Sequence, residues 1–403
     1  MGRDEGKPIV QIPSLFFLVF SGVMCLLPFS MFILPEIDMW VGNGLFFQFG
    51  MFLLFLISFV DKGKNDVVKG NVPLIVFALW CSISTSMMFY DAARAKFFNF
   101  LNIFAFISLL TFFFFYRIVS EYMTREKMKK ALWYLSISVS IIVFYCLIQK
   151  LNLDQFQHPT VELESLPLKD RRDFLVGTIG NPTHLASYLA ISLPLFYRLN
   201  SNFSFFMSCL VWAIIGWTGS ASGLLTAVSV TVFYGFFFRL KSIAIAIIGV
   251  VFYSILFFSK GFDILEISKM YMNPSGRIEM WGRLFDIWRA KPLFGYGLGF
   301  LNYINKVDSS IWSHAHCEAL QTALELGLVG LVLAFWCVVD FFRTFWKTAK
   351  SSLEVSLASM FLGFIVSGFF NFPAHIWMIS SLGMMAYSFM YVIKNEEENS
   401  YND

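Results

Sequence analysis

Two histidines just before a long apolar stretch are the first candidates for chemistry. His314 and His316 stand in the segment SHAHCEALQTALELG, residues 313–327. The unperturbed pKa of histidine, about 6.5, suits proton transfer near neutral pH. The pair is weak as a metal site because no third ligand follows at a suggestive spacing, so neither a metal nor a cofactor is predicted. The alternative is two interfacial histidines that are hydrogen-bonded to loop backbone.

A helix that carries arginines is predicted just upstream, in NPSGRIEMWGRLFDIWRAKPLFGYGLGF, residues 273–300. Asn273 and Pro274 form a helix-start signal, and the apolar spacing predicts about 14 helical residues ending before Pro292. Its apolar face is expected to lie in the membrane interface, with tryptophan as anchor. Arg277 lies in the first turn, where the helix dipole disfavours a cation. It is therefore the arginine predicted to bind an anion, the alternative being an ordinary solvated arginine.

The other charges of this region have local explanations. Glu279 and Arg283 are four residues apart in the favourable order for a pair, and Arg289 lies near the helix end, where a cation suits the dipole. GYGLG at 295–299 lacks the spacing of a nucleotide-binding loop and is predicted to turn the chain back toward the membrane. Glu325 lies inside an apolar span, which is costly unless it faces a polar interior.

A second basic segment is KDRRDFLVGTIGNPTHLASYLAISLPLF, residues 169–196. Arg171 and Arg172 are candidates to bind phosphate, or they pair with the aspartates on either side of them. Asn181 belongs to a Gly-Asn-Pro turn before the next helix, whose N-terminus favours an anion. Two basic segments, one followed by histidine, predict a pocket for an anionic substrate tethered to the membrane.

The composition places these segments in an integral membrane protein. The 403 residues are 57% hydrophobic and only 14% charged, with 50 phenylalanines. A soluble domain averages roughly 25% charged residues, so most of this chain must have lipid as its solvent. The fold class predicted is an all-α polytopic membrane protein with about twelve spans. The spans are expected at 13–34, 44–60, 72–90, 97–116, 131–149, 183–197, 203–218, 222–238, 242–259, 317–342, 353–371 and 375–393.

The positive-inside rule orients these spans with both termini in the cytoplasm. In that orientation the short outside loops carry only Arg94 and Lys96. Two long external loops, 150–182 and 260–316, then hold most of the candidate chemistry. Residues 1–394 are expected to form a single transmembrane domain, and residues 395–403 a disordered cytoplasmic tail.

Three segments in this order resemble the O-antigen ligase and polymerase superfamily: GTIGNPTHLASYLAISLPL, SGRIEMWGRLFDIWRAKPLFGYGLGF and HCEALQTALELGLVGL. The resemblance covers roughly residues 170–345. It implies a fold like that of GT-C-type membrane glycosyltransferases, with an active site on the external, periplasmic face of the bacterial inner membrane. It also implies a metal-independent enzyme that moves a glycan from a polyprenyl diphosphate (undecaprenyl diphosphate) carrier to a hydroxyl.

The resemblance assigns roles residue by residue. Arg277 matches the family arginine that precedes a tryptophan, and His316 the histidine that opens a His-Asn motif before a helix with Glu-x-Gly. Arg172 matches the arginine before the Gly-Asn-Pro turn. The sequence departs from the family at Cys317, where asparagine is usual, and at Thr183, where a second asparagine often follows. It also has residues 220–222 where Ser-Arg is usual, so it is a divergent member.

The predicted catalytic residues are therefore His316, Arg277 and His314, and the predicted diphosphate-binding residues are Arg172, Arg171, Arg283 and Asn181. The predicted partners are a carrier-linked glycan donor, a glycan or lipid A core acceptor and membrane lipid, with no nucleic acid. An O-antigen ligase is favoured, with a surface-polysaccharide polymerase or a protein O-oligosaccharyltransferase as the alternative. A transporter of polysaccharide or lipid-linked sugar is a different class. Transporters place charges near the bilayer midplane, whereas here the charges gather in external loops.

Overall fold

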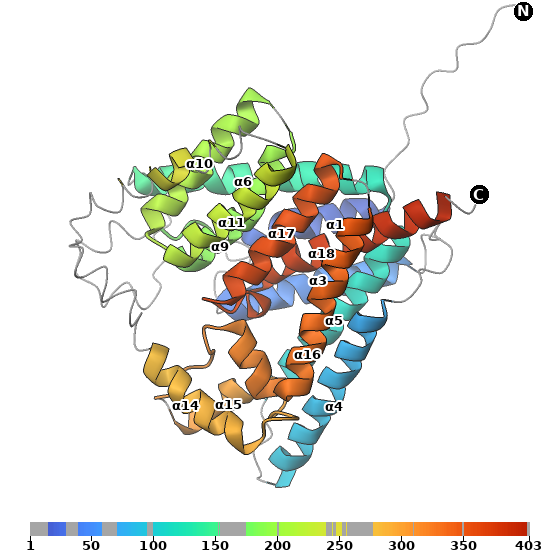
Figure 1. Ribbon diagram of the computed structural model, residues 1–403, viewed down its shortest axis with the longest axis vertical. Coiled ribbons are helices and arrows are strands. Elements are labelled where there is room, and N and C mark those ends of the chain that lie inside the picture. Colours follow the sequence, from blue (N-terminus) through green and yellow to red (C-terminus); the bar gives the residue numbers. More distant parts are fainter. Residues whose placement is uncertain are drawn as a thin grey trace, which may run out of the picture.

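The computed structural model describes residues 15–29, 39–58, 71–94, 100–151, 153, 175–199, 201–238, 244, 247–251, 255, 277–308, 310–348 and 350–400. The expected span at 242–259 and the residues Arg171, Arg172, Asn273 and Pro274 lie wholly or largely outside these ranges. Within them the chain forms helices and connecting turns, with no strand (Figure 1). An all-α fold is therefore confirmed for the described part of the chain.

The helices follow the expected spans closely. Their bounds are α1 (Leu15–Leu26), η1 (Leu27–Phe29), α3 (Met39–Ser58), α4 (Val72–Arg94), α5 (Phe100–Tyr122), α6 (Arg125–Lys150), α9 (Pro182–Tyr197), α10 (Asn202–Thr218), α11 (Ala221–Phe238), α14 (Arg277–Ala290), α15 (Phe300–Val307), α16 (Glu318–Lys347), α17 (Ser352–Gly368), η3 (Pro373–His375) and α18 (Trp377–Ser400). Lipid offers no hydrogen bonds to backbone, so apolar segments of this length become helices.

Three of the described helices, α6, α11 and α16, are long and apolar enough to cross a membrane by themselves. Shorter apolar helices accompany them, at 15–29, 72–87, 202–218 and 352–368. This pattern is that of a multi-pass membrane protein. The packing supports it, because small residues let the helices approach closely. A Cβ on Gly223 of α11 would lie 2.4 Å from the Cβ of Ala186 in α9.

Helix α9 forms the centre of this bundle. Nearly all its side chains from Pro182 to Phe196 are buried, so it is apolar all round rather than amphipathic. It packs against α6, α10, α11, α17 and α18. The N-terminus of α9 therefore has a fixed place at one end of the bundle.

Helix α16 breaks near its start, and a loop packs into the break. Gly327 has φ of 69° and ψ of −174°. The chain around Gly295 lies directly against it: Tyr296 N donates to Leu324 O (3.0 Å) and Gly297 N to Glu325 O (2.7 Å), while Leu328 N donates to Pro292 O (2.8 Å). The glycines of GYGLG thus serve a close backbone contact as well as the expected turn, since a Cβ on Gly295 would lie 2.4 Å from Glu325 O.

The amphipathic helix at 277–290 is confirmed as α14, but its apolar face does not serve only the membrane interface. Met280 and Leu284 are buried against α15 and the segment around Ala315. Trp281, one of the two tryptophans of this helix, donates its Nε1 hydrogen to Ala315 O (2.7 Å). Figure 1 shows α14 and α15 together at one end of the bundle, beside α16. The histidine segment therefore rests on α14.

The opposite end of the bundle is closed by Arg125 at the start of α6. Its guanidinium contacts the buried carboxylate of Glu354 (3.0 Å) and the carboxylates of Glu396 (3.9 Å) and Glu397 (2.7 Å). These residues lie at the ends of three helices, α6, α17 and α18, which the positive-inside rule had placed on the same side of the membrane. The contacts also correct the expectation of a disordered tail: α18 continues to Ser400, because its last turns are held by Arg125.

Gly327→Ala should destabilise the protein, because the new Cβ would lie 2.2 Å from Leu293 O at a positive φ. We expect a loss of roughly 2 kcal/mol or more, read as a lower Tm of the detergent-purified protein. Gly282→Ala on α14 is the matched control, since nothing lies within 4 Å of its added Cβ. Equal Tm values for the two variants would contradict the role given to the break in α16.

Candidate active site

The turn between α17 and α18 gathers four of the five histidines of the chain. The ring of Phe372 is buried there, stacked on His314 with centroids 4.2 Å apart. His316 meets the same ring edge-on at 4.8 Å, and His184 at 5.5 Å. His375 lies 5.2 Å from His314. Histidines from three separate chain segments therefore share one site.

His316 occupies a strained backbone conformation, with φ of 50°. Among described residues other than glycine it alone has a positive φ, a conformation that such residues rarely adopt and that often marks functional sites. Burial, and then the charge of Arg277, lower the pKa of His316 to about 4. Its imidazole is thus neutral near pH 7 and able to accept a proton.

Arg277 begins the described part of α14 and points to the same turn. Its Nη1 donates to Phe370 O at 3.0 Å. Its Nε is buried and has no hydrogen-bond partner within the described residues. Partial burial lowers the pKa of the Arg277 guanidinium, although arginine stays charged at any ordinary pH. A partly buried cation with a free donor beside a neutral base can hold an anion.

Of the other predicted residues that the structure describes, His314 lies in this centre, whereas Arg283 and Asn181 have other partners. Burial, and then the neighbouring histidines, lower the pKa of His314 well below its ordinary value. Arg283 is directed elsewhere: its Nη1 donates to Ser310 Oγ at 2.9 Å. Asn181 caps α9, its Oδ1 accepting from Thr183 N and His184 N. This cap explains Asn181 structurally and places the N-terminus of α9 beside His184.

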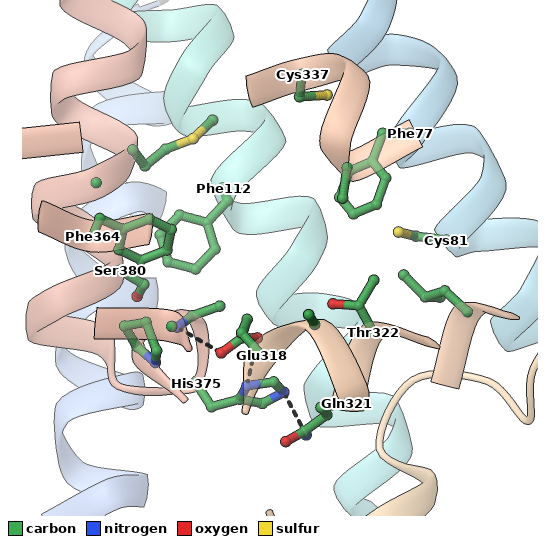
Figure 2. A pocket seen from close by; sticks show the side chains of 18 of the residues that line it. Phe77, Cys81, Phe112, Glu318, Gln321, Thr322, Cys337, Phe364, His375 and Ser380 are labelled. Atoms are coloured by element: carbon green, nitrogen blue, oxygen red, sulfur yellow. Dashed lines mark hydrogen bonds and ion pairs between the residues drawn. The ribbon is translucent and has the colours of Figure 1, made fainter. Parts of the chain in front are cut away.

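Several residues of the site were not predicted from the sequence. His375 lies between the side chains of Glu318 and Gln321, as Figure 2 shows. His184 was placed only in the expected span at 183–197. One signal was available in the sequence. His184 and His375 each stand two residues after a proline at the edge of an apolar span, where a titratable group points to function. Burial and the carboxylate of Glu318 act oppositely on His375, and the net effect raises its pKa.

A cavity of about 620 Å³ adjoins these residues, between α4, α5, α16, α17 and α18. Its walls are mostly apolar, including Phe77, Phe112 and Phe364 (Figure 2). His314, Glu318 and His375 are among its few polar lining groups. Arg277 and His316 do not line it. The site therefore has an apolar chamber on the His314 side and a cationic group at Arg277.

Ser222, in the segment where the resemblance led us to expect an arginine, also reaches this turn. Ser222 Oγ accepts from Nδ2 of the buried Asn371 at 3.1 Å, and Ser187 Oγ accepts from the same atom at 3.3 Å. The serines thus fix the turn by hydrogen bonds. Among described residues, no group of three histidine, cysteine or acidic side chains is arranged to hold a metal ion.

Comparison with known proteins finds a family model that matches part of the chain. The family model described as O-antigen ligase matches residues 205–335, a stretch that contains Arg277, Arg283, His314 and His316. Asn181, His184 and His375 lie outside it. A Rickettsia felis protein, by name a candidate polysaccharide ligase, is 27% identical over 161 residues, which are 36% of this chain and 39% of that protein.

Two further relatives carry similar names. The Rickettsia conorii protein is 27% identical over 161 residues, covering 36% of this chain and 38% of its own. The Rickettsia typhi protein is 25% identical over 166 residues, covering 37% of this chain and 40% of its own. The chain thus spans about two fifths of the length of the curated relatives it matches. Through the matched domain and these relatives, the chain is similar to the O-antigen ligase superfamily.

Proposed function

We propose that this protein is a membrane glycosyltransferase that moves a glycan from a polyprenyl diphosphate carrier to an acceptor hydroxyl. The observation that supports it most is the pairing of Arg277, whose Nε is buried with no partner among the described residues, with His316, whose imidazole is neutral. A glycosyl diphosphate donor needs a cation at its leaving group, and an alcohol acceptor needs a base. Similarity to the O-antigen ligase superfamily favours the same reaction.

In the proposed mechanism the guanidinium of Arg277 binds the diphosphate through its fork of N–H donors. Arg171, Arg172, Arg283 and the α9 N-terminus at Asn181 are proposed to assist. The acceptor hydroxyl loses its proton to a ring nitrogen of His316 while its oxygen attacks the anomeric carbon. The bond from that carbon to the diphosphate oxygen breaks, and the diphosphate leaves with the electron pair. Direct displacement inverts the anomeric configuration, and arginine supplies the positive charge without a metal.

The O-antigen ligase activity, with lipid A core as acceptor, is the first choice within this class. The site is proposed to face the periplasm, and the Arg125 cluster the cytoplasm. A polymerase would use a carrier-bound repeat unit as acceptor, and a protein O-oligosaccharyltransferase a protein hydroxyl. A transporter is a weaker candidate because the charged site lies at one end of the bundle.

Gel analysis of surface glycans after gene deletion separates these possibilities. A ligase predicts loss of long chains on the lipid core while carrier-linked polymer accumulates. A core that bears a single repeat would instead identify a polymerase. An unchanged ladder would contradict both activities.

His316→Ala and Arg277→Ala should each reduce glycan transfer by about 100-fold or more, because each removes a group that acts in the transition state. Transfer is measured with purified protein and a lipid-linked donor, and membrane levels are compared by immunoblot. Arg289→Ala is the matched control on the same helix, since Arg289 is 66% exposed and pairs with Asp286. Normal transfer by both site variants would refute the mechanism.

The imidazole of His316 should stay neutral from about pH 5 to 8, since burial and the charge of Arg277 lower its pKa to about 4. Ring ¹⁵N NMR of histidine-labelled protein in nanodiscs measures this, with His316→Gln identifying the signal. Arg277→Gln removes a neighbouring positive charge, so it should raise the pKa of His316. A wild-type titration near the ordinary value would show that His316 is not shielded as described.

A further inference from the structure

His375 is held between two side chains of one turn of α16. Its Nδ1 lies 3.3 Å from Glu318 Oε1, and its Nε2 lies 3.0 Å from Gln321 Nε2. Figure 2 shows the imidazole between the two side chains, which approach it from α16. Glu318 Oε2 also accepts from Ala374 N at 3.4 Å, so the carboxylate ties η3 to α16.

One backbone N–H group fixes the donor and acceptor roles in the hydrogen bonds of Gln321 and His375. The N–H of Ala315 can only donate, and it donates to Gln321 Oε1 at 3.2 Å. The Nε2 of Gln321 is then a donor to Glu325 Oε1 at 3.4 Å and to His375. Because an amide nitrogen cannot accept, Nε2 of His375 must be the acceptor. The proton of the neutral ring therefore lies on Nδ1, which faces Glu318 Oε1 at 3.3 Å.

We propose that His375 is a positioning residue for the transfer site, acting through Gln321 on the segment that carries His314 and His316. The neutral imidazole of His375 accepts a hydrogen bond from Gln321 Nε2. The Oε1 of Gln321 in turn accepts from the backbone N–H of Ala315, which lies between His314 and His316 in the chain. This inference rests on the proposed transfer reaction and adds a residue to it.

Protonation of His375 would undo this arrangement. A second proton on Nε2 would face the Nε2 hydrogens of Gln321, so Gln321 would have to turn its amide and release Ala315 N and Glu325. The groups that face His375 are Glu318 and Glu325 from α16 and His314 from the loop. Burial lowers the pKa of His375, but the two carboxylates outweigh burial and raise it. His375 therefore gains its proton at higher pH than His316, and transfer should fall as pH drops through the His375 pKa.

The test is kcat/KM for glycan transfer between about pH 8 and 5. His375→Ala should lower kcat/KM by about tenfold or more over this whole pH range, because Gln321 loses a hydrogen-bond acceptor. His375→Gln keeps an acceptor that does not titrate, so it should restore much of the lost rate and abolish the acid limb. Glu318→Gln removes an anion, so the limb should move to lower pH. An acid limb that is unchanged in His375→Gln would overturn the proposal.

A second readout does not depend on activity. Ring ¹⁵N shifts at about pH 8 should show His375 with its proton on Nδ1, with the signal assigned by its loss in His375→Gln. A proton on Nε2 would overturn the inference even if transfer is confirmed. If the protein transfers no glycan, the proposed function fails while the tautomer measurement still tests the contact between His375 and Gln321.

Discussion

The structure depends on the contacts of one short turn, between α17 and α18. The carbonyl of Phe370 accepts from Arg277, the ring of Phe372 packs on three imidazoles, and Asn371 bonds to serines of α9 and the start of α11. Most of these contacts use backbone or uncharged groups. Within the described part of the chain no carboxylate forms an ion pair with Arg277, so we expect its positive charge to be open to a substrate.

A second constraint, the break in α16, positions the loop after α14 and the start of α16. Backbone hydrogen bonds around Gly295 and Gly327 tie the loop after α14 to α16. Ser84 Oγ of α4 also donates to Glu325 O at 3.2 Å, and Trp80 Nε1 to Leu326 O at 2.9 Å. Carbonyls freed by the break are thus satisfied, as a lipid environment requires. The histidine segment, residues 313–316, is therefore joined directly to α16 at one end and is held by Trp281 of α14 at Ala315.

Hydropathy alone predicted the helices well, because the need to satisfy backbone groups in lipid is local to each segment. The helix at 277–290 was predicted from its apolar spacing. Its burial against α15 was not, because amphipathic spacing does not distinguish protein from membrane interface. Arg277 and His316 were predicted from residue type and motif. His375 and Gln321 were not, because they meet across 54 residues and no local pattern encodes that contact. The helical C-terminal end depends likewise on the distant Arg125.

The central claim is that Arg277 holds a diphosphate at this turn, and binding of a polyprenyl diphosphate to purified protein tests it without requiring turnover. Affinity should exceed that for the corresponding monophosphate, and Arg277→Ala should weaken diphosphate binding by about tenfold or more, as expected for a lost charge-assisted hydrogen bond. Arg289→Ala should bind like the wild type. Equal diphosphate affinity in wild type and Arg277→Ala would contradict the account.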